Sequence, residues 1–421
     1  MKNTPSWKRS CGDSCVVRRS GRRARATLHM PVQCFADDAS LPPSLREAHA
    51  LIRELQFPAN CSSQRILEWP GIRGTLTGIG SAMHDVTVAM AVAWASGRTL
   101  VMSMRSPPKD SWYLEACKDP KASNVYECMG LAPISSCVVP RSGGPDHHVL
   151  RQQVIANNCT LPPVLFSTDP RHRVVTLPQN PIATSNCFAG QAILLRPAGR
   201  PIRPFASALP LWRTGALSDY IKAYALASTF FLRPGPALRR RIERTLADAF
   251  KGDEPRPEDT LGMPLRGSDK CGLESTCPSF ASHMAAAERI RAAHPHVSTI
   301  LLTSDDVTYL KEWPNYSPRW RFVLNNDDVH QATGGLRKEQ ANLIGHTKRD
   351  IFASMLGTLQ LQLRARYWLV NCKSEWHRLI VELARTGRCA GGAEELFVQC
   401  SESKALHMKD GERMTEFVPV Q

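Results

Sequence analysis

The chain has 421 residues, enough for two or three domains of ordinary size. Hydrophobic residues make up 43% of it and charged residues 22%, a globular composition that excludes a disordered, collagen-like or coiled-coil chain. No apolar run reaches the roughly 18 residues that a membrane helix needs.

The net charge of +15 is concentrated at the amino terminus, where residues 1–35 carry eight Lys or Arg and a single Asp. The mild excess over the rest of the chain fits a nucleotide-diphosphate site as well as a larger polyanion. Because no zinc-finger spacing or basic-aromatic repeat is present, we do not expect nucleic-acid binding.

Residues 1–40 predict a basic, disordered leader. Met1–Arg25 is rich in Arg and Ser, is nearly free of acid and has no apolar core of the kind that a secretory signal needs. It is compatible with an organellar transit segment, with plain disorder, or with a start site assigned downstream of a signal anchor. No signal or transmembrane segment is visible in the sequence.

The first structured elements follow this leader. Helical spacing predicts a helix over Leu45–Leu55, and the apolar run Val86–Ala95 predicts a buried helix that leads into a strand at Arg98–Met102. Glycines precede the second helix, notably Gly78 and Gly80. A glycine-rich turn before a helix and a strand predicts an α/β unit with backbone amides exposed at the helix start, although a simple tight turn would look the same.

Residues 103–210 are rich in Pro, Cys and Ser and predict long, disulfide-tied loops with short strands. Their cysteine cluster is typical of a domain that folds in the secretory pathway; it comprises Cys117, Cys128, Cys137, Cys159 and Cys187. Glycosylation sequons at Asn60, Asn158 and Asn315 agree with a lumenal location, the last being weakened by Pro318.

Regular helices are expected again at Ser218–Phe231 and Pro236–Phe250, before the charged, proline-broken stretch Lys251–Thr260. This stretch is the best domain boundary in the chain. We therefore expect an N-terminal α/β domain over residues 41–252, a second domain over 261–400 and a tail over 401–421.

Strands and helices alternate in the second domain. Strands are predicted up to Arg266 and at 297–303, 321–324 and 367–372, with helices at 281–293, after 306, from about 347 and at 376–386. This alternation predicts a doubly wound parallel sheet. Ligands of such sheets bind at the carboxyl ends of the strands, where the sequence places three polar groups: Arg266–Lys270, Asp305–Asp306 and Asn371–Ser374.

The densest group of chemical side chains comprises Arg266, Ser268, Asp269, Lys270 and Glu274, within nine residues. A guanidinium fork and an ammonium suit a diphosphate, and a carboxylate with a raised pKa could deprotonate an attacking hydroxyl. A solvated charged turn is the alternative.

Residues 266–274, RGSDKCGLE, resemble the R-R-T-D-K-x-G-x-E signature of the α1,6-fucosyltransferases, which include the animal core enzymes and the rhizobial chitooligosaccharide enzymes (glycosyltransferase family 23). Further similar blocks occur in family order across roughly residues 70–390: Gly78–Val88 with Arg98–Leu100, Phe231–Pro236, Thr303–Asp306 with Pro314–Tyr316, Asp350–Ile351 and Val370–Ser374.

The resemblance implies two facing α/β domains of GT-B type, the C-terminal one a Rossmann-type domain that binds GDP-fucose. It implies an inverting transfer of fucose, without metal or other cofactor, to a GlcNAc-containing glycan through an α1,6 linkage, in N-glycan processing in the Golgi lumen. Glu274 would be the base, acting with Lys270 and Arg266. The implied donor-site residues are Arg266, Ser268, Asp269, Gly78, Gly80, His84, Asp305, Asp306, Asp350 and Ser374.

The sequence departs from the family pattern near the signature. Gly267 replaces its second Arg, Pro264 replaces a His, and Glu375 with Trp376 replaces Ser-Gln. The carboxyl-terminal SH3 domain and the amino-terminal coiled coil of the animal enzymes are not expected here. Two alternatives follow: a catalytically degenerate member that binds nucleotide or glycan, or an enzyme like the protein O-fucosyltransferases. Retention of Lys270 and Glu274 favours an enzyme.

Overall fold

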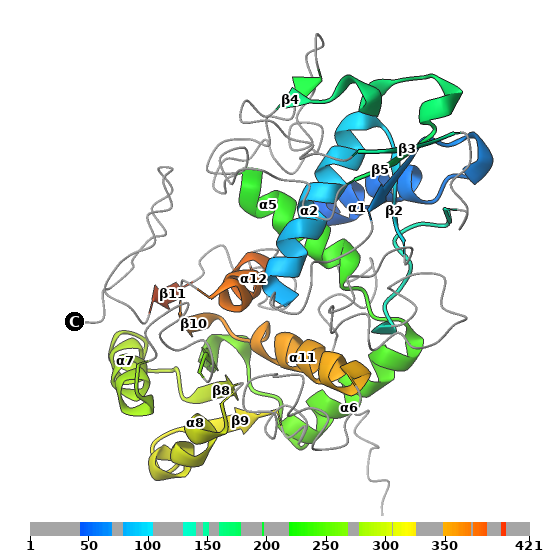
Figure 1. Ribbon diagram of the computed structural model, residues 1–421. Coiled ribbons are helices and arrows are strands. Elements are labelled where there is room, and N and C mark those ends of the chain that lie inside the picture. The colour runs from blue at the N-terminus through cyan, green and yellow to red at the C-terminus, as the bar shows by residue number, and fades with distance from the viewer. Residues whose placement is uncertain are drawn as a thin grey trace, which may run out of the picture.

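The computed structural model describes residues 43–69, 79–103, 129–139, 146–150, 160–177, 196–197, 219–267, 278–304, 306–325, 348–371, 374–384 and 397–400. Most of the strands in these ranges belong to two parallel β-sheets, each accompanied by helices (Figure 1). The predicted α/β class, with a parallel sheet in each half of the chain, is confirmed. The domain limits at 252 and 261 remain predictions.

The first sheet has the strand order β2-β1-β5-β3 and is parallel throughout. Its strands are β1 (Ile66–Trp69), β2 (Thr99–Met102), β3 (His147–Val149) and β5 (Val174–Thr176), preceded by α1 (Pro43–Gln56) and joined by α2 (Ile79–Ser96). Both helices and β2 were predicted. Strand β1 was not, because it contains a carboxylate, Glu68, and is nevertheless buried along its whole length.

Glu68 is held in a polar cluster on this sheet. It lies beside Thr176 in the register, and the Thr176 hydroxyl donates to its carboxylate over 2.5 Å. Nε2 of His147 lies 3.2 Å from the same Oε2. Since Glu68 is only 1% exposed, the hydroxyl and the imidazole supply the polar partners that a buried carboxylate needs.

A buried guanidinium holds together the starts of three strands of the first sheet. Arg98, just before β2, is fully buried and donates to five backbone carbonyls, those of Ile66, Val164, Leu165, His172 and Arg173. These carbonyls belong to β1, to the 3-10 helix η3 (Pro163–Phe166) and to the segment that enters β5. Burial, followed by the charge of Arg65, lowers the pKa of Arg98 to about 10, so it remains charged at neutral pH.

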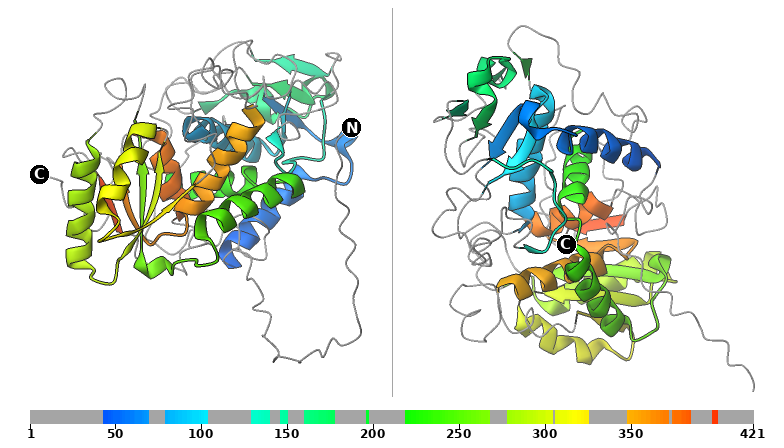
Figure 2. Two further views of the ribbon diagram at one scale, coloured as in Figure 1. Left: turned by 90° about the horizontal axis from the view of Figure 1, so that it is seen from below. Right: turned by 90° about the vertical axis from the view of Figure 1, so that its right-hand side faces the viewer.

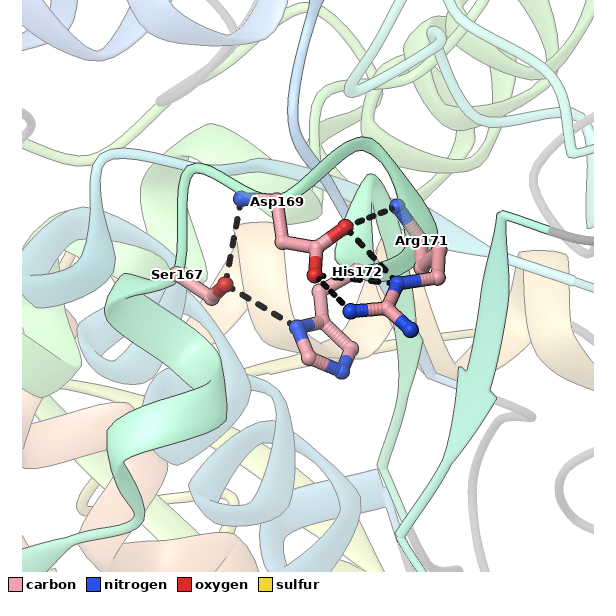
Figure 3. A network of polar contacts seen from close by, with 4 residues as sticks. All are labelled: Ser167, Asp169, Arg171 and His172. Carbon is pink, nitrogen blue, oxygen red and sulfur yellow. Dashed lines mark hydrogen bonds and ion pairs between the residues drawn. The ribbon is translucent and has the colours of Figure 1, made fainter.

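The loop that Arg98 anchors has its own outer network around the 3-10 helix η4 (Pro170–His172), shown in Figure 3. The Asp169 carboxylate accepts from the backbone and the guanidinium of Arg171, whose hydrogen bond is the main reason that the pKa of Asp169 falls to about 2. The Ser167 hydroxyl accepts from the Asp169 amide and lies 2.9 Å from Nδ1 of His172. The loop is therefore fixed from both sides.

The second sheet has the strand order β11-β10-β7-β8-β9 and is also parallel. Numbered along the chain this order is 5-4-1-2-3, the arrangement of a Rossmann-type sheet. Its strands are β7 (Thr260–Leu265), β8 (Thr299–Ser304), β9 (Arg321–Leu324), β10 (Tyr367–Val370) and β11 (Phe397–Cys400), and its helices are α7 (Phe280–Ala293), α8 (Val307–Glu312), α11 (Lys348–Gln362) and α12 (Glu375–Ala384). All were predicted within a few residues except β11.

Alternate residues of these strands enter two different cores. Ile300 and Leu302 of β8 pack in one cluster with Phe280 of α7, whereas Leu301 packs in the other with Phe352 of α11. Burial on both faces explains why residues 299–304 form one continuous buried run without polar alternation.

The two halves of the molecule meet at helices. Helix α12 packs against α2 and against α5 (Asp219–Phe231), between the second sheet and the first half (Figures 1 and 2). Helix α6 (Pro236–Phe250) packs against α11. At that contact a Cβ on Gly357 would lie 3.0 Å from Cγ2 of Thr245, so the glycine lets the helices approach closely.

Cys137 forms a disulfide with Cys61, with 5.4 Å between their Cα atoms. The prediction of an oxidised cysteine cluster is therefore confirmed at Cys137, with a partner outside the cluster. Cys117, Cys128, Cys159 and Cys187 lie outside the described residues, as do the leader and the tail. No helix within the described ranges is both long and apolar enough to cross a membrane.

We expect Arg98→Met to lower the free energy of unfolding by about 3–5 kcal/mol, because removal of a buried charge leaves five carbonyls without their donor. Arg65→Met is the matched control. Arg65 binds the Ser96 and Gly97 carbonyls from a less buried position, and the loss should be about 1 kcal/mol. Urea unfolding measures both values; equal losses would contradict the special role of Arg98.

Candidate functional site

The carboxyl ends of three adjacent strands, β10, β7 and β8, form the candidate site. The direction of winding reverses between β10 and β7, and crevices at such a reversal are where doubly wound sheets bind ligands. Arg266 follows β7, Asp306 follows β8 and Asn371 follows β10. The prediction that these three polar groups share one edge of the second sheet is confirmed by the strand order.

Gly267 and Asp306 are in direct contact at this edge. An ideal Cβ built on Gly267 would lie 2.5 Å from both Cβ and Oδ2 of Asp306, a separation that no real side chain tolerates. The Asp306 backbone amide donates to the Ser304 hydroxyl over 2.9 Å, which fixes the turn after β8. The Asp306 side chain therefore leaves no room for a side chain at position 267 in this arrangement.

The turn between β10 and α12 is closed by three hydrogen bonds. The Ser374 amide donates to the Asn371 carbonyl over 3.0 Å, and the His377 amide lies 3.5 Å from the Ser374 hydroxyl, which caps the helix. The backbone amide of Asn371 donates to Nδ1 of the His377 side chain over 2.8 Å. His377 thus does what the Glu or Gln of a capping box does, reaching back from the first turn of a helix to the loop before it.

The His377 imidazole is uncharged at neutral pH. Because Nδ1 accepts a hydrogen bond, the proton of the neutral ring is on Nε2, which is buried and has no hydrogen-bond partner among the described residues. Burial lowers the pKa of His377 to about 3, and the charges of Arg266 and His283 act in the same direction.

Helix α7 completes the surroundings of the site. Nδ1 of His283 lies 3.0 Å from the Ser279 carbonyl, and burial lowers the pKa of His283. The His283 ring meets Tyr309 edge-on at 6.1 Å between centroids. The Tyr309 hydroxyl donates to the Pro278 carbonyl, and burial followed by the charges of Asp306 and Glu312 raises the pKa of Tyr309. Among the described residues at this edge, Arg266 and Asp306 therefore carry charge at neutral pH, and the rings around them are uncharged.

Of the residues predicted for the site, the structure locates Arg266, Asp306, Ser374 and Gly80, the last near the start of α2. His84 lies in α2 and Asp350 in α11, and their side chains are outside the description. Gly78, Ser268, Asp269, Lys270, Glu274 and Asp305 lie outside the described residues. The roles assigned to all of these residues remain predictions.

The sequence predicted neither a role for His377 nor the contact between Gly267 and Asp306. A His one residue after a predicted helix start is a weak signal, because only the turn geometry shows which atom it contacts. The described residues contain no cluster of three or more metal-ligating His, Cys, Asp or Glu side chains.

We expect Gly267→Ala to lower the free energy of unfolding by about 1–3 kcal/mol, because the added methyl group overlaps Asp306. Asp306→Gly removes all of the overlapping atoms, Cβ included, so the double variant should regain most of the loss. Chemical denaturation of the wild type, both single variants and the double variant gives the coupling energy. Additive losses would show that the two residues do not compete for space.

His377 also predicts a pH dependence of stability. Its folded pKa lies below its unfolded value, so its stabilising contribution is complete above about pH 6.5 and is lost as the pH falls toward 3. The stability difference between the wild type and His377→Asn, in which Oδ1 can still accept from Asn371, should change by about 1.4 kcal/mol per pH unit in that window. Urea unfolding at pH 7, 6 and 5 measures it; a constant difference would contradict a buried neutral imidazole.

The chain was compared with proteins of known function and structure. No protein-family profile matches it. A curated α-(1,6)-fucosyltransferase of Drosophila melanogaster is 25% identical over 307 residues, which are 70% of this chain and 41% of that protein. The match thus spans about two-fifths of the relative's length.

Among solved structures, the fucosyltransferase NodZ of Bradyrhizobium is 14% identical, with 76% of this chain and 93% of NodZ covered and a TM-score of 0.38. POFUT1 in complex with GDP-fucose is 12% identical, with 81% and 98% covered and a TM-score of 0.38. The FUT1 protein of Arabidopsis thaliana in complex with GDP is 10% identical, with 80% and 73% covered and a TM-score of 0.41. The resemblance to α1,6-fucosyltransferases that the motifs indicate is confirmed by the curated match.

Proposed function

We propose that the chain is a glycosyltransferase that moves fucose from GDP-fucose to a hydroxyl of a GlcNAc-containing glycan. The finer proposal is an inverting α1,6 transfer that needs no metal, in the processing of N-glycans in the lumen of the secretory pathway. The observation that carries the proposal is the position of Arg266, because the family signature begins at the residue that follows the first strand at the winding reversal of a Rossmann-type sheet.

The charges of the described site support a nucleotide diphosphate. Arg266 follows β7 at the winding reversal, and its charge contributes to the lowered pKa of His377 in α12. The dipole at the start of α12 also favours an anion. The neutral state of His377 leaves the cationic role to Arg266. The sequence adds Lys270 four residues later, so two cations would stabilise the leaving diphosphate where other enzymes use a divalent ion.

The proposed reaction is a single displacement. The acceptor hydroxyl oxygen forms a bond to C1 of fucose while the bond from C1 to the β-phosphate oxygen breaks, so GDP leaves and the configuration at C1 inverts. The hydroxyl proton passes to Glu274, which acts as general base. A sugar hydroxyl is too weak an acid to ionise at neutral pH, so this base is the side chain on which turnover depends most.

A binding protein without turnover is the second candidate, since Gly267 removes one cation of the family signature. A pure binder has no need of the Lys270–Glu274 pair.

The disulfide between Cys61 and Cys137 supports the proposed lumenal location, because such bonds form and persist in oxidising compartments.

We expect the chain to transfer fucose from GDP-fucose to a GlcNAc-terminated N-glycan or a chitooligosaccharide in the presence of EDTA. Glu274→Gln should lower kcat by about 10²–10⁴ with little change in GDP affinity, because it removes the base and keeps the shape. Arg266→Ala should weaken GDP binding. The exposed pair Glu258→Gln and Arg256→Ala are the matched controls and should change neither quantity.

Calorimetry measures GDP binding, and mass spectrometry of the product glycan measures transfer. Wild-type binding of GDP without transfer or hydrolysis of GDP-fucose would favour the binding protein. Wild-type activity that EDTA abolishes and manganese restores would overturn the metal-independent mechanism, and an active Glu274→Gln variant would overturn the assignment of the base.

A further inference from the structure

We propose that Asn60 is an N-glycosylation site, and that its glycan is attached before the Cys61–Cys137 disulfide forms. The sequon is Asn60-Cys61-Ser62, so the middle residue of the acceptor tripeptide is itself one half of the disulfide. The inference rests on the proposed lumenal location and is independent of the transferase chemistry.

The sequon lies on an open surface. Asn60, Ser62 and Ser63 are exposed, in the loop between the end of α1 at Gln56 and the start of β1 at Ile66. Since the loop enters β1, it lies at the amino ends of the strands of the first sheet, opposite the carboxyl ends at which such sheets bind ligands. A glycan here would extend into solvent without crossing that edge.

The hydrogen bonds of Asn60 are compatible with an attached sugar. Its side-chain Oδ1 accepts from the Ser62 amide over 2.9 Å and from the Ser62 hydroxyl over 2.8 Å. Both bonds use Oδ1, whereas the bond to a sugar is made by Nδ2. The folded loop, with Asn60 as the cap of the 3-10 helix η2 (Cys61–Ser63), therefore keeps its geometry after modification.

The disulfide restricts access to the same tripeptide. Cys61 is bonded to Cys137, which is only 6% exposed, and the adjacent Ser136 amide donates to the Gln56 carbonyl over 3.2 Å. A transferase must enclose both the Asn side chain and the hydroxyl two residues later. A tripeptide whose central side chain is fixed to the protein surface cannot be enclosed in this way, so attachment has to come first.

Glycan attachment and disulfide formation are two separate reactions. The bond between the anomeric carbon of a lipid-linked diphospho-oligosaccharide and its phosphate oxygen breaks, a C–N bond to Asn60 Nδ2 forms, and Nδ2 loses one proton. The thiols of Cys61 and Cys137 then lose two protons and two electrons to the disulfide of a thiol oxidoreductase, which is reduced to a dithiol.

Asn315 provides an internal comparison. It is exposed in the 3-10 helix η9 (Trp313–Tyr316), but the Ser317 hydroxyl of its sequon donates to the Pro314 carbonyl over 2.9 Å. Pro318 follows and restricts the backbone of Ser317. We expect Asn315 to stay unmodified.

The experiment uses the full chain, secreted from insect cells behind a cleavable signal, and reads occupancy by mass spectrometry of peptides before and after enzymatic removal of N-glycans. Asn60→Gln should remove one glycan mass, and Asn315→Gln should remove none. Cys137→Ser keeps the sequon intact and leaves Cys61 reduced, so occupancy at Asn60 should rise above that of the wild type. Cys187→Ser is the matched cysteine control and should leave it unchanged.

Synthesis of the lipid-linked donor is partially inhibited, so that glycan occupancy at Asn60 of the wild type stays below completion and can rise in a variant. Occupancy is measured on the total cellular protein, because a Cys137→Ser chain that folds poorly would be lost from the secreted fraction. Asn60 unmodified in both the wild type and Cys137→Ser would overturn the site. Equal partial occupancy in these two proteins would overturn the proposed order. Both readouts are independent of GDP binding and of fucose transfer, so they fail separately from the proposed function.

Discussion

Helix α12 must satisfy two sets of neighbours at once, and the arrangement of the molecule depends on this constraint. Its amino end closes the turn after β10 at the candidate site, where His377 accepts a hydrogen bond from Asn371. Its body buries Leu379, Ile380 and Leu383 in a core shared with α2 and α5 of the first half. Because α12 contacts both, a shift of the first half relative to the second sheet should move the turn after β10, and a change in that turn should shift the first half.

The two sheets use different side chains to satisfy the hydrogen bonds of their buried polar groups. In the first sheet one cation, Arg98, satisfies carbonyls from three separate segments, with no carboxylate partner in the described part of the chain. In the second sheet amides do this work: Gln362 of α11 donates to the Leu301 carbonyl and the Thr303 hydroxyl, and Asn325 donates to the Thr358 hydroxyl. These uncharged amides satisfy buried hydrogen-bonding groups of the second sheet without burying a charge.

The alternation of strands and helices was predictable because parallel strands buried on both faces are short apolar runs, as at 299–304 and 367–370. Strand β1 escaped prediction because Glu68 interrupts its apolar character, and its burial becomes favourable only with Thr176 and His147 from strands far away in sequence. The pairing of Cys61 with Cys137 spans 76 residues and could not be read from spacing. The alternation of strands and helices was enough to predict the sheet edge that carries the site. The contact of Gly267 with Asp306 and the hydrogen bond between Asn371 and His377 depend on local geometry that no sequence motif encodes.

Helix α6 precedes the charged stretch that separates the two halves in sequence, yet it is joined to the second half. It packs on α11 at Gly357, and the residues just after it form ion pairs with that half, Glu254 with Arg364 and Asp253 with Arg321. The charged, proline-broken stretch therefore does not separate α6 from the helix on which it packs. A C-terminal fragment that begins at residue 261 would lack α6 and expose to water the side of α11 on which α6 packs. A fragment that begins at residue 235 would keep α6 and so keep that side of α11 buried. The boundaries of fragments of this protein should therefore be chosen from helix packing and not from the proline-rich stretch in the sequence.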